Sequence, residues 1–259
     1  MLALERHGHV LRATLDRPPV NAIDDALLAA LEGAVQQAVD DQRISVLHLR
    51  SAQRTFCAGA DLAYMRDCFD REHGTETMLG MVQRMQRLFA RLEAAPLVTL
   101  AEIGGAALGG GFELALACDL RIAADEARLG LPEVGLGLLP GAGGTQRLTR
   151  LVGTGVARRL ILGAETLTGA QAAPLGLVQW ALPRAELAAQ AEAIVARLAG
   201  LPRHALAANK HCIELAAEPG DAGYAEEIQA TRRLYDDPET RRRVTNFLNR
   251  HAADRSDPA

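Results

Sequence analysis

The segment ALGGGFELALACD, residues 107–119, carries the strongest structural signal in the sequence. Three consecutive glycines precede an apolar helical stretch whose first turn contains Glu113. Glycines let backbone N–H groups approach a ligand without obstruction from a side chain, and a helix N-terminus adds a partial positive charge. This turn is therefore suited to a developing oxyanion. The alternative is a tight strand-to-helix turn without a ligand, and the glycine spacing does not fit the dinucleotide-binding pattern G-x-G-x-x-G.

A second glycine-rich segment, GLPEVGLGLLPGAGGTQRL at residues 130–148, places the carboxyl group of Glu133 among leucines and a valine. A buried carboxylate is costly to desolvate, so we expect the pKa of Glu133 to be raised if this segment is buried. A raised pKa is the property that a general acid needs.

A third segment, TFCAGADL at residues 55–62, follows an apolar run that ends at Leu49. Its small residues Ala58, Gly59 and Ala60 could bring the backbone against a flat ligand. It could equally be a plain loop at the end of a strand, and taken alone it favours the loop.

Apolar periodicity predicts a βαβ rhythm along the first part of the chain. From Pro183 onward the pattern is helical, with an interruption near Gly200. We therefore expect an α/β body followed by a helical tail. The expected strands are residues 10–15, 46–50, 97–103 and 120–123, and the expected helices are residues 24–40 and 111–118.

The composition excludes several classes of protein. With 259 residues, 49% hydrophobic and 23% charged, the chain has ordinary globular composition and length for one large domain. A net charge of -4 gives no general attraction to nucleic acid or to an anionic membrane. No apolar run is long enough to cross a bilayer, so we expect a soluble, cytoplasmic protein. His7 and His9 are the best candidate metal pair, but they lack a third clustered ligand, and we expect no metal site.

The three segments, in this order and spacing, closely resemble the enoyl-CoA hydratase/isomerase (crotonase) superfamily. The likeness extends from RPPVNAI at residues 17–23 to FLNR at residues 247–250. It implies an α/β fold, the crotonase (ClpP-like) spiral of repeated ββα units with a C-terminal helical trimerisation region. It also implies a spiral core with the active site at residues 1–200, and a region for oligomerisation and closure of the CoA pocket at residues 201–259. A homotrimer or a dimer of trimers is expected from the same resemblance.

The resemblance further implies a catalytic apparatus. The N–H groups of Ala60 and Gly110 would hold the thioester oxygen of an acyl-CoA substrate, and Glu113 and Glu133 would hold one water between them. Hydration needs oxygen delivered to C3 and a proton delivered to C2, so one carboxyl group, Glu113, would take a proton from water while Glu133 donates one. The implied reaction is reversible hydration of a trans-2-enoyl-CoA to a 3-hydroxyacyl-CoA, with no metal or redox cofactor.

Residues that would bind CoA are also implied. The backbone around Ala58 would meet the adenine, with Asp61 and Leu62 flanking the nucleotide and the pantetheine. Lys210, the single lysine of the chain, falls where relatives place a lysine that reaches CoA phosphates, although it could be a solvated helix residue. Phe247 and Arg250 match an ending that in relatives contacts CoA held mainly by a neighbouring subunit.

Three points stay open from the sequence. A group of methionines, Met65, Met78, Met81 and Met85, could line a pliable acyl pocket or form ordinary core. Arg242 and Arg243 stand where relatives commonly carry Glu-Gly, which leaves the part of the tail in CoA binding undecided. The rival functions are a 3,2-enoyl-CoA isomerase or another crotonase-type lyase, with Glu133 alone moving the isomerase's proton, and an RNA- or CoA-binding protein without hydratase activity.

Overall fold

The computed structural model of the protein describes residues 1–216 and 220–255, without the side chains of residues 247, 248 and 250–255. Within these residues, no helix is long and apolar enough to cross a membrane.

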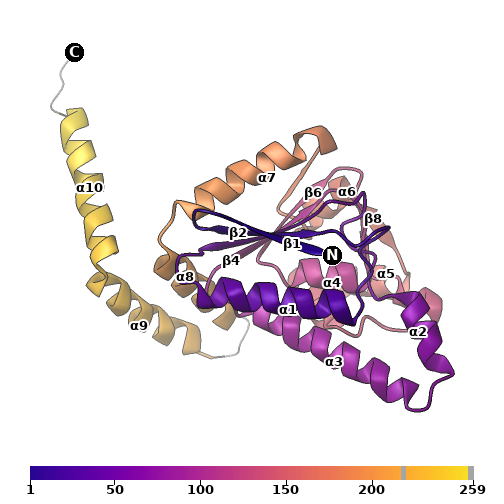
Figure 1. Cartoon of the computed structure of the whole chain (residues 1–259). Coiled ribbons are helices and arrows are strands. Elements are labelled where there is room, and N and C mark those ends of the chain that lie inside the picture. Colours follow the sequence, from indigo (N-terminus) through magenta and orange to yellow (C-terminus); the bar gives the residue numbers. More distant parts are fainter. Residues whose placement is uncertain (217–219, 256–259) are drawn as a thin grey trace.

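A six-stranded sheet forms the centre of the molecule (Figure 1). Its first two strands pair antiparallel, and every other neighbouring pair is parallel. In order across the sheet, the strands are β1 (Leu2–His7), β2 (Val10–Leu15), β3 (Val46–Ser51), β4 (Val98–Ile103), β6 (Leu120–Ala124) and β9 (Trp180–Leu182).

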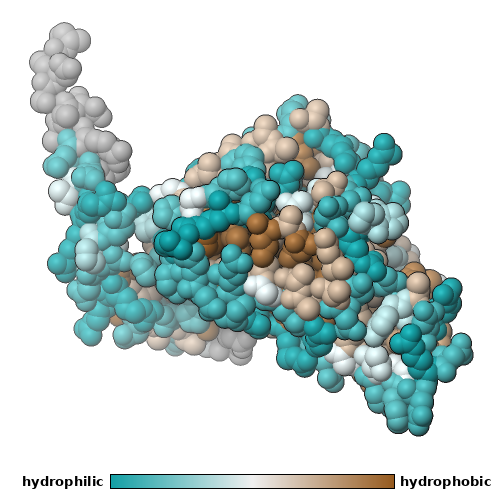
Figure 2. Space-filling view, in the orientation of Figure 1, coloured by the Kyte–Doolittle hydropathy of each residue, from teal (hydrophilic) through white to brown (hydrophobic). Residues whose placement is uncertain are grey.

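The parallel strands are apolar because helices cover both faces of the sheet. All six residues of β4 are buried, as expected for a central parallel strand. Helix α7 packs against β3, β4 and β6, while α1 packs against β3 and against α3. Figure 1 shows α7 on one side of the sheet and α1 and α3 on the other, and Figure 2 shows a hydrophobic band where the sheet meets α1.

The helices of the body begin and end as follows. They are α1 (Asp25–Asp40), α2 (Leu62–Phe69), α3 (Gly74–Glu93), α4 (Gly110–Leu116), α5 (Gly144–Leu162), α6 (Gly169–Ala172) and α7 (Arg184–Ala199), with the 3-10 helices η1 (Glu133–Leu136) and η2 (Ala173–Leu175). Helix α1 begins where its sequence predicts, because the Asp24 side chain accepts the Leu27 N–H at 2.8 Å as a cap.

A three-stranded sheet frames the functional region. It consists of β5 (Ala107–Leu108), β7 (Arg128–Gly130) and β8 (Thr166–Thr168) in spatial order. Strand β5 leads directly into α4, and β7 ends shortly before η1. The two glycine-rich segments that carry Glu113 and Glu133 are therefore neighbours in this sheet, although they are separate in the sequence.

Three helices form the C-terminal tail, α8 (Arg203–Leu215), α9 (Ala222–Asp236) and α10 (Pro238–Arg255). Helix α9 packs mainly on α8 and α10 mainly on α9, and Figure 1 shows α9 and α10 reaching out from one side of the body. The expected α/β body with a C-terminal helical region is confirmed. The boundary at residue 200 falls between α7 and α8 but stays a prediction as a division into domains.

Candidate active site

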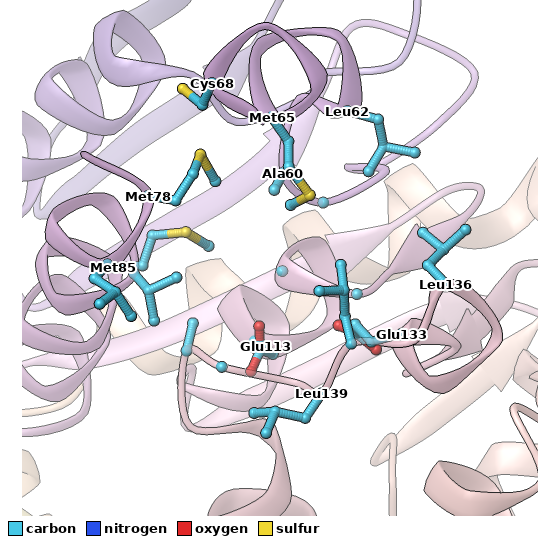
Figure 3. Close-up of a pocket in the computed structure, with 18 of the residues that line it drawn as sticks. Ala60, Leu62, Met65, Cys68, Met78, Met85, Glu113, Glu133, Leu136 and Leu139 are labelled. Carbon is cyan, nitrogen blue, oxygen red and sulfur yellow. The ribbon is translucent and has the colours of Figure 1, made fainter. Parts of the chain in front are cut away.

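A cavity of about 480 Å³ lies between helices α2 and α3 on one side and the α4 and η1 segments on the other (Figure 3). Its walls are mainly apolar, and two carboxyl groups enter it from the same side. The lining includes Ala58, Gly59, Ala60, Leu62, Met65, Cys68, Met78, Leu79, Val82, Met85, Gly109, Gly110, Glu113, Glu133, Leu136, Leu138 and Leu139.

Glu113 projects from the first turn of α4 and is almost wholly buried, with 2% of its surface exposed. Its Oε1 accepts the N–H of Gly144 at 2.7 Å. Gly144 must be glycine, because a β-carbon there would lie 2.8 Å from this same Oε1 and 2.9 Å from a carbon of Pro140. The contact fixes one oxygen of the carboxyl group.

Glu133 is the first residue of η1 and is partly buried. Within the described part of the chain, its Oε2 is buried and has no hydrogen-bond partner. Its Oε1 lies against the turn before α4, since a β-carbon at Gly109 would stand 3.0 Å from it. An unpartnered buried oxygen at a cavity wall is expected to bind a polar atom of a ligand or a water.

Burial shifts the titration of both carboxyl groups. Desolvation raises the pKa of Glu113 to about 7, against the lowering effect of the Gly144 N–H, and the charge of Glu133 adds to the rise. Desolvation also raises the pKa of Glu133 above its ordinary value. With its pKa near 7, Glu113 can exchange protons with a ligand near neutral pH, and the raised pKa of Glu133 favours its protonated form.

Two backbone amides at the cavity are free. Within the described residues, neither the N–H of Ala60 nor that of Gly110 donates a hydrogen bond. Around Ala60 the neighbouring groups pair with Ile23, because Ile23 donates to Gly59 and accepts from Asp61. This pairing turns the N–H of Ala60 away from Ile23.

Glycines allow these two amides to approach each other. A β-carbon at Gly110 would lie 3.6 Å from the Ala60 nitrogen and 2.8 Å from Cε of Met85. A β-carbon at Gly111 would lie 2.1 Å from the carbonyl oxygen of Cys57, which is impossible without moving the backbone. The glycine run is thus required for the close packing of the 57–60 segment on the α4 turn.

A polar network supports the segment that carries Ala60. The Nη2 of Arg17 contacts Asp61 Oδ2 at 2.8 Å and Asp24 Oδ2 at 3.0 Å. The fully buried Asn21, whose φ is 53°, donates from Nδ2 to the carbonyl oxygen of Phe56 at 2.9 Å. Residues 17–23 carry part of the family resemblance, but their sequence alone did not predict this supporting role.

The other predicted site residues fall into three groups. Ala58 and Leu62 line the cavity, whereas Asp61 caps α2 by accepting the N–H groups of Ala63 and Tyr64.

Lys210 is not among the lining residues. Its ammonium group is 3.0 Å from Asp119 Oδ1 and 3.3 Å from the carbonyl oxygen of Leu97, and its side chain is 10% exposed. The side chains of Phe247 and Arg250 lie outside the described residues.

Some features of the site were missed from sequence. Gly144 holds Glu113 from 31 residues away, and the only local signal was the run GAGG at residues 141–144. Of the four methionines that could line a pocket or form core, Met65, Met78 and Met85 line the cavity, while Met81 is buried in the core. Among the described residues, no group of three His, Cys, Asp or Glu could hold a metal ion.

The fold and the cavity together define an enzyme of the crotonase fold class. The chain belongs to the enoyl-CoA hydratase/isomerase family, whose sequence model matches residues 5–257. The expected crotonase fold is confirmed by a crystal structure of an enoyl-CoA hydratase from Bacillus anthracis, which superposes with a TM-score of 0.90 at 32% identity and covers 96% of each chain.

Curated relatives agree with this assignment. The 2,3-dehydroadipyl-CoA hydratase of Escherichia coli is 36% identical over 255 residues, which are 98% of this chain and 97% of the relative. A mouse protein named enoyl-CoA hydratase domain-containing protein 2, mitochondrial, is 48% identical over 174 residues. That match covers 66% of this chain and 57% of the mouse protein.

Proposed function

We propose that the protein catalyses the reversible hydration of a trans-2-enoyl-CoA to a 3-hydroxyacyl-CoA. The observation that carries the proposal is the pairing of two buried carboxyl groups, Glu113 and Glu133, with two free amides at one apolar cavity. Relatives over most of the chain are named hydratases of acyl-CoA thioesters, which supports the same reaction.

The amides of Ala60 and Gly110 are the proposed oxyanion site. Each N–H would donate to the thioester oxygen, and both bonds would strengthen as negative charge moves onto that oxygen in the enolate-like transition state. The loss of one such donor typically raises the barrier by about 3–4 kcal/mol. Once a substrate fills the cavity, its mainly apolar walls would lower the local dielectric and strengthen both bonds.

The two glutamates are the proposed acid and base. Glu113 would take a proton from a water held between the carboxyl groups, so that the oxygen attacks C3, and Glu133 would deliver a proton to C2. A base works best when its pKa lies near the working pH, which suits a Glu113 pKa of about 7. In the reverse direction the two groups exchange roles.

Hydration moves no electrons between substrate and protein, so the proposed reaction needs no redox cofactor. The amides would supply the polarisation of the thioester that a metal ion could otherwise supply, and we propose that none is used. For CoA itself, we propose contacts with the backbone of Ala58 and with Asp61 and Leu62. Ala58 and Leu62 line the cavity, and Asp61 lies next to Leu62 in the chain. We also propose that the working form is a homotrimer or a dimer of trimers in which Phe247 and Arg250 contact CoA held mainly by a neighbour.

The test is conversion of trans-but-2-enoyl-CoA to its 3-hydroxy product by wild type, Glu113→Gln and Glu133→Gln. Each change is expected to lower kcat by at least about 100-fold, since one proton-transfer group is lost. Glu126→Gln, on an exposed turn after β6, is the matched control and should retain activity. If Glu133→Gln alone were inactive and double-bond migration occurred, the isomerase alternative would replace the hydratase.

A further inference from the structure

Helix α3 forms one long wall of the cavity. Met78, Val82 and Met85 lie four and then three residues apart, so they share one face of the helix, and all three line the cavity. Met85 stands at the reacting end, because its Cε lies 2.8 Å from the position of a β-carbon at Gly110. Figure 3 shows Met78 and Cys68 on the same side of the cavity as Met85, across from the two glutamates.

The distance from Met85 to Met78 along α3 can be compared with the length of an acyl chain. Seven residues separate Met85 from Met78, which corresponds to about 10 Å at the rise of an α-helix. With carbon–carbon bonds of about 1.5 Å and tetrahedral angles, an extended acyl chain of about eight carbons spans the same distance.

The opposite wall is also apolar and partly uncovered. Leu136 is 62% exposed and Leu139 is 68% exposed, and both line the cavity. An acyl chain would remove this surface from water. Each methylene so buried increases the equilibrium constant for transfer out of water by about fourfold. Met65 and Met78 supply flexible thioether side chains that adapt to chains of different length.

The charges around the cavity disfavour acyl groups that end in a carboxylate. Among the described residues that line it, none is Lys, Arg or His, and the two charged groups are Glu113 and Glu133. The terminal carboxylate of a six-carbon acyl group would lie beside Val82, where it would lose water and gain no partner. The N-terminus of α3 at Gly74 could attract an anion, but it lies eleven residues from Met85, about 16 Å along the helix.

We propose that the site selects a neutral acyl chain of up to about eight carbons, matched to the α3 wall, and rejects a six-carbon chain that ends in a carboxylate. The proposal rests on the hydratase function. The proposed selectivity distinguishes this protein from its full-length relative named 2,3-dehydroadipyl-CoA hydratase, whose named substrate carries such a carboxylate. Leu79, Val82 and Met78 on α3 are the proposed specificity-determining residues.

The experiment measures kcat/KM for the trans-2-enoyl-CoA thioesters of four, six and eight carbons and for 2,3-dehydroadipyl-CoA. In parallel it measures Kd for the saturated thioesters of the same acyl groups, which needs no turnover. We expect kcat/KM to rise at least about tenfold from four to eight carbons, and the neutral six-carbon substrate to exceed the dicarboxylic one by at least about 100-fold. The Kd values should follow the same order.

Two variants test the wall itself. Met78→Trp should lower the ratio of eight- to four-carbon kcat/KM, whereas Leu162→Trp, exposed on α5 outside the cavity, should leave that ratio unchanged. Leu79→Arg, at a 55% exposed position of the wall, should raise use of 2,3-dehydroadipyl-CoA at least about tenfold by supplying a partner for its carboxylate.

Flat kcat/KM and Kd values across chain length, or equal use of the dicarboxylic substrate, would overturn the selectivity. Absence of all turnover, with Kd values still in the expected order, would overturn the hydratase function and leave the selectivity standing.

Discussion

Glu113 combines two properties that usually conflict, deep burial and a need to be charged during the reaction. Burial raises its pKa to about 7 from an ordinary value of 4.5. As the proposed base it must be deprotonated, so kcat/KM for hydration should fall as the pH drops below about 7. A pH profile of the wild type checks this, and an acidic limb near pH 4.5 instead would contradict it.

The raised pKa of Glu113 also makes the folded protein less stable as the pH rises. A folded-state pKa above the unfolded value means that the folded protein binds the extra proton between about pH 4.5 and 7. The stabilisation is full below pH 4.5 and is lost as the pH rises through 7. Between pH 5 and 8 the free energy of unfolding of wild type should therefore fall by about 2–3 kcal/mol relative to Glu113→Gln. Urea unfolding measures it, with Glu126→Gln as the control, and parallel curves for Glu113→Gln and wild type would refute the shift.

Much of the site at this scale was predictable because it is encoded locally. Both glutamates stand beside glycine runs in apolar context, and the structure brings them to one cavity. Partners distant in sequence could not be predicted, because nothing local indicates that the Gly144 N–H meets Glu113. Nor does a helical pattern reveal which way a lone lysine faces, and Lys210 lies against Asp119.

At the scale of elements, α4 is short and depends on its ends. Its N-terminal turn carries Gly110 and Glu113, and Arg121, which is 3% exposed, lies at its C-terminal end. The guanidinium group donates to the carbonyl oxygens of Ala115 and Cys118 near the helix end, and to that of Leu177 at 2.7 Å. One side chain thus ties the helix with the proposed catalytic groups to the segment before β9.

Replacement of Arg121 should therefore lower the stability of the protein. Arg121→Met leaves the carbonyl groups of Cys118 and Leu177 without this donor, at about 1–3 kcal/mol each, so we expect the free energy of unfolding to fall by about 2 kcal/mol or more. Arg121→Lys should recover part of the loss because it keeps the charge. The recovery should be incomplete because a lysine cannot reach all of the same carbonyl groups. Urea unfolding measures both, with the exposed Arg150→Met as the matched control. A loss below 1 kcal/mol for Arg121→Met would show that α4 does not depend on this cap.

Element prediction succeeded where burial is uniform and failed at the margins. The fully buried β4 and the capped α1 lie where the sequence predicted them, within a residue at each end. Strand β1 was missed because most of its residues are exposed and its pattern lacks apolar alternation. The three-residue strands β7 and β8 are too short to produce a period.

At the scale of the whole molecule, the tail exposes more apolar surface than a solitary chain normally would. On α9, Tyr224, Ile228 and Tyr235 share one face, since they lie four and eleven residues apart, and each is at least 70% exposed. On α8, Ile213 is 73% exposed. Apolar surface gathered in this way marks a protein contact, which supports the proposed homotrimer or dimer of trimers.

The tail surface can be tested directly. Ile228→Asp combined with Tyr235→Asp places two charges on the apolar face of α9, and burying them at a subunit contact would cost more than the contact supplies. Light scattering after size-exclusion chromatography should give the mass of three or six chains for wild type and of one chain for the double variant, with unchanged helical circular dichroism. Gln229→Asp, exposed on a different side of the same helix, should keep the wild-type mass. A monomeric wild type, or a double variant that stays assembled, would mean that this face of α9 does not join subunits.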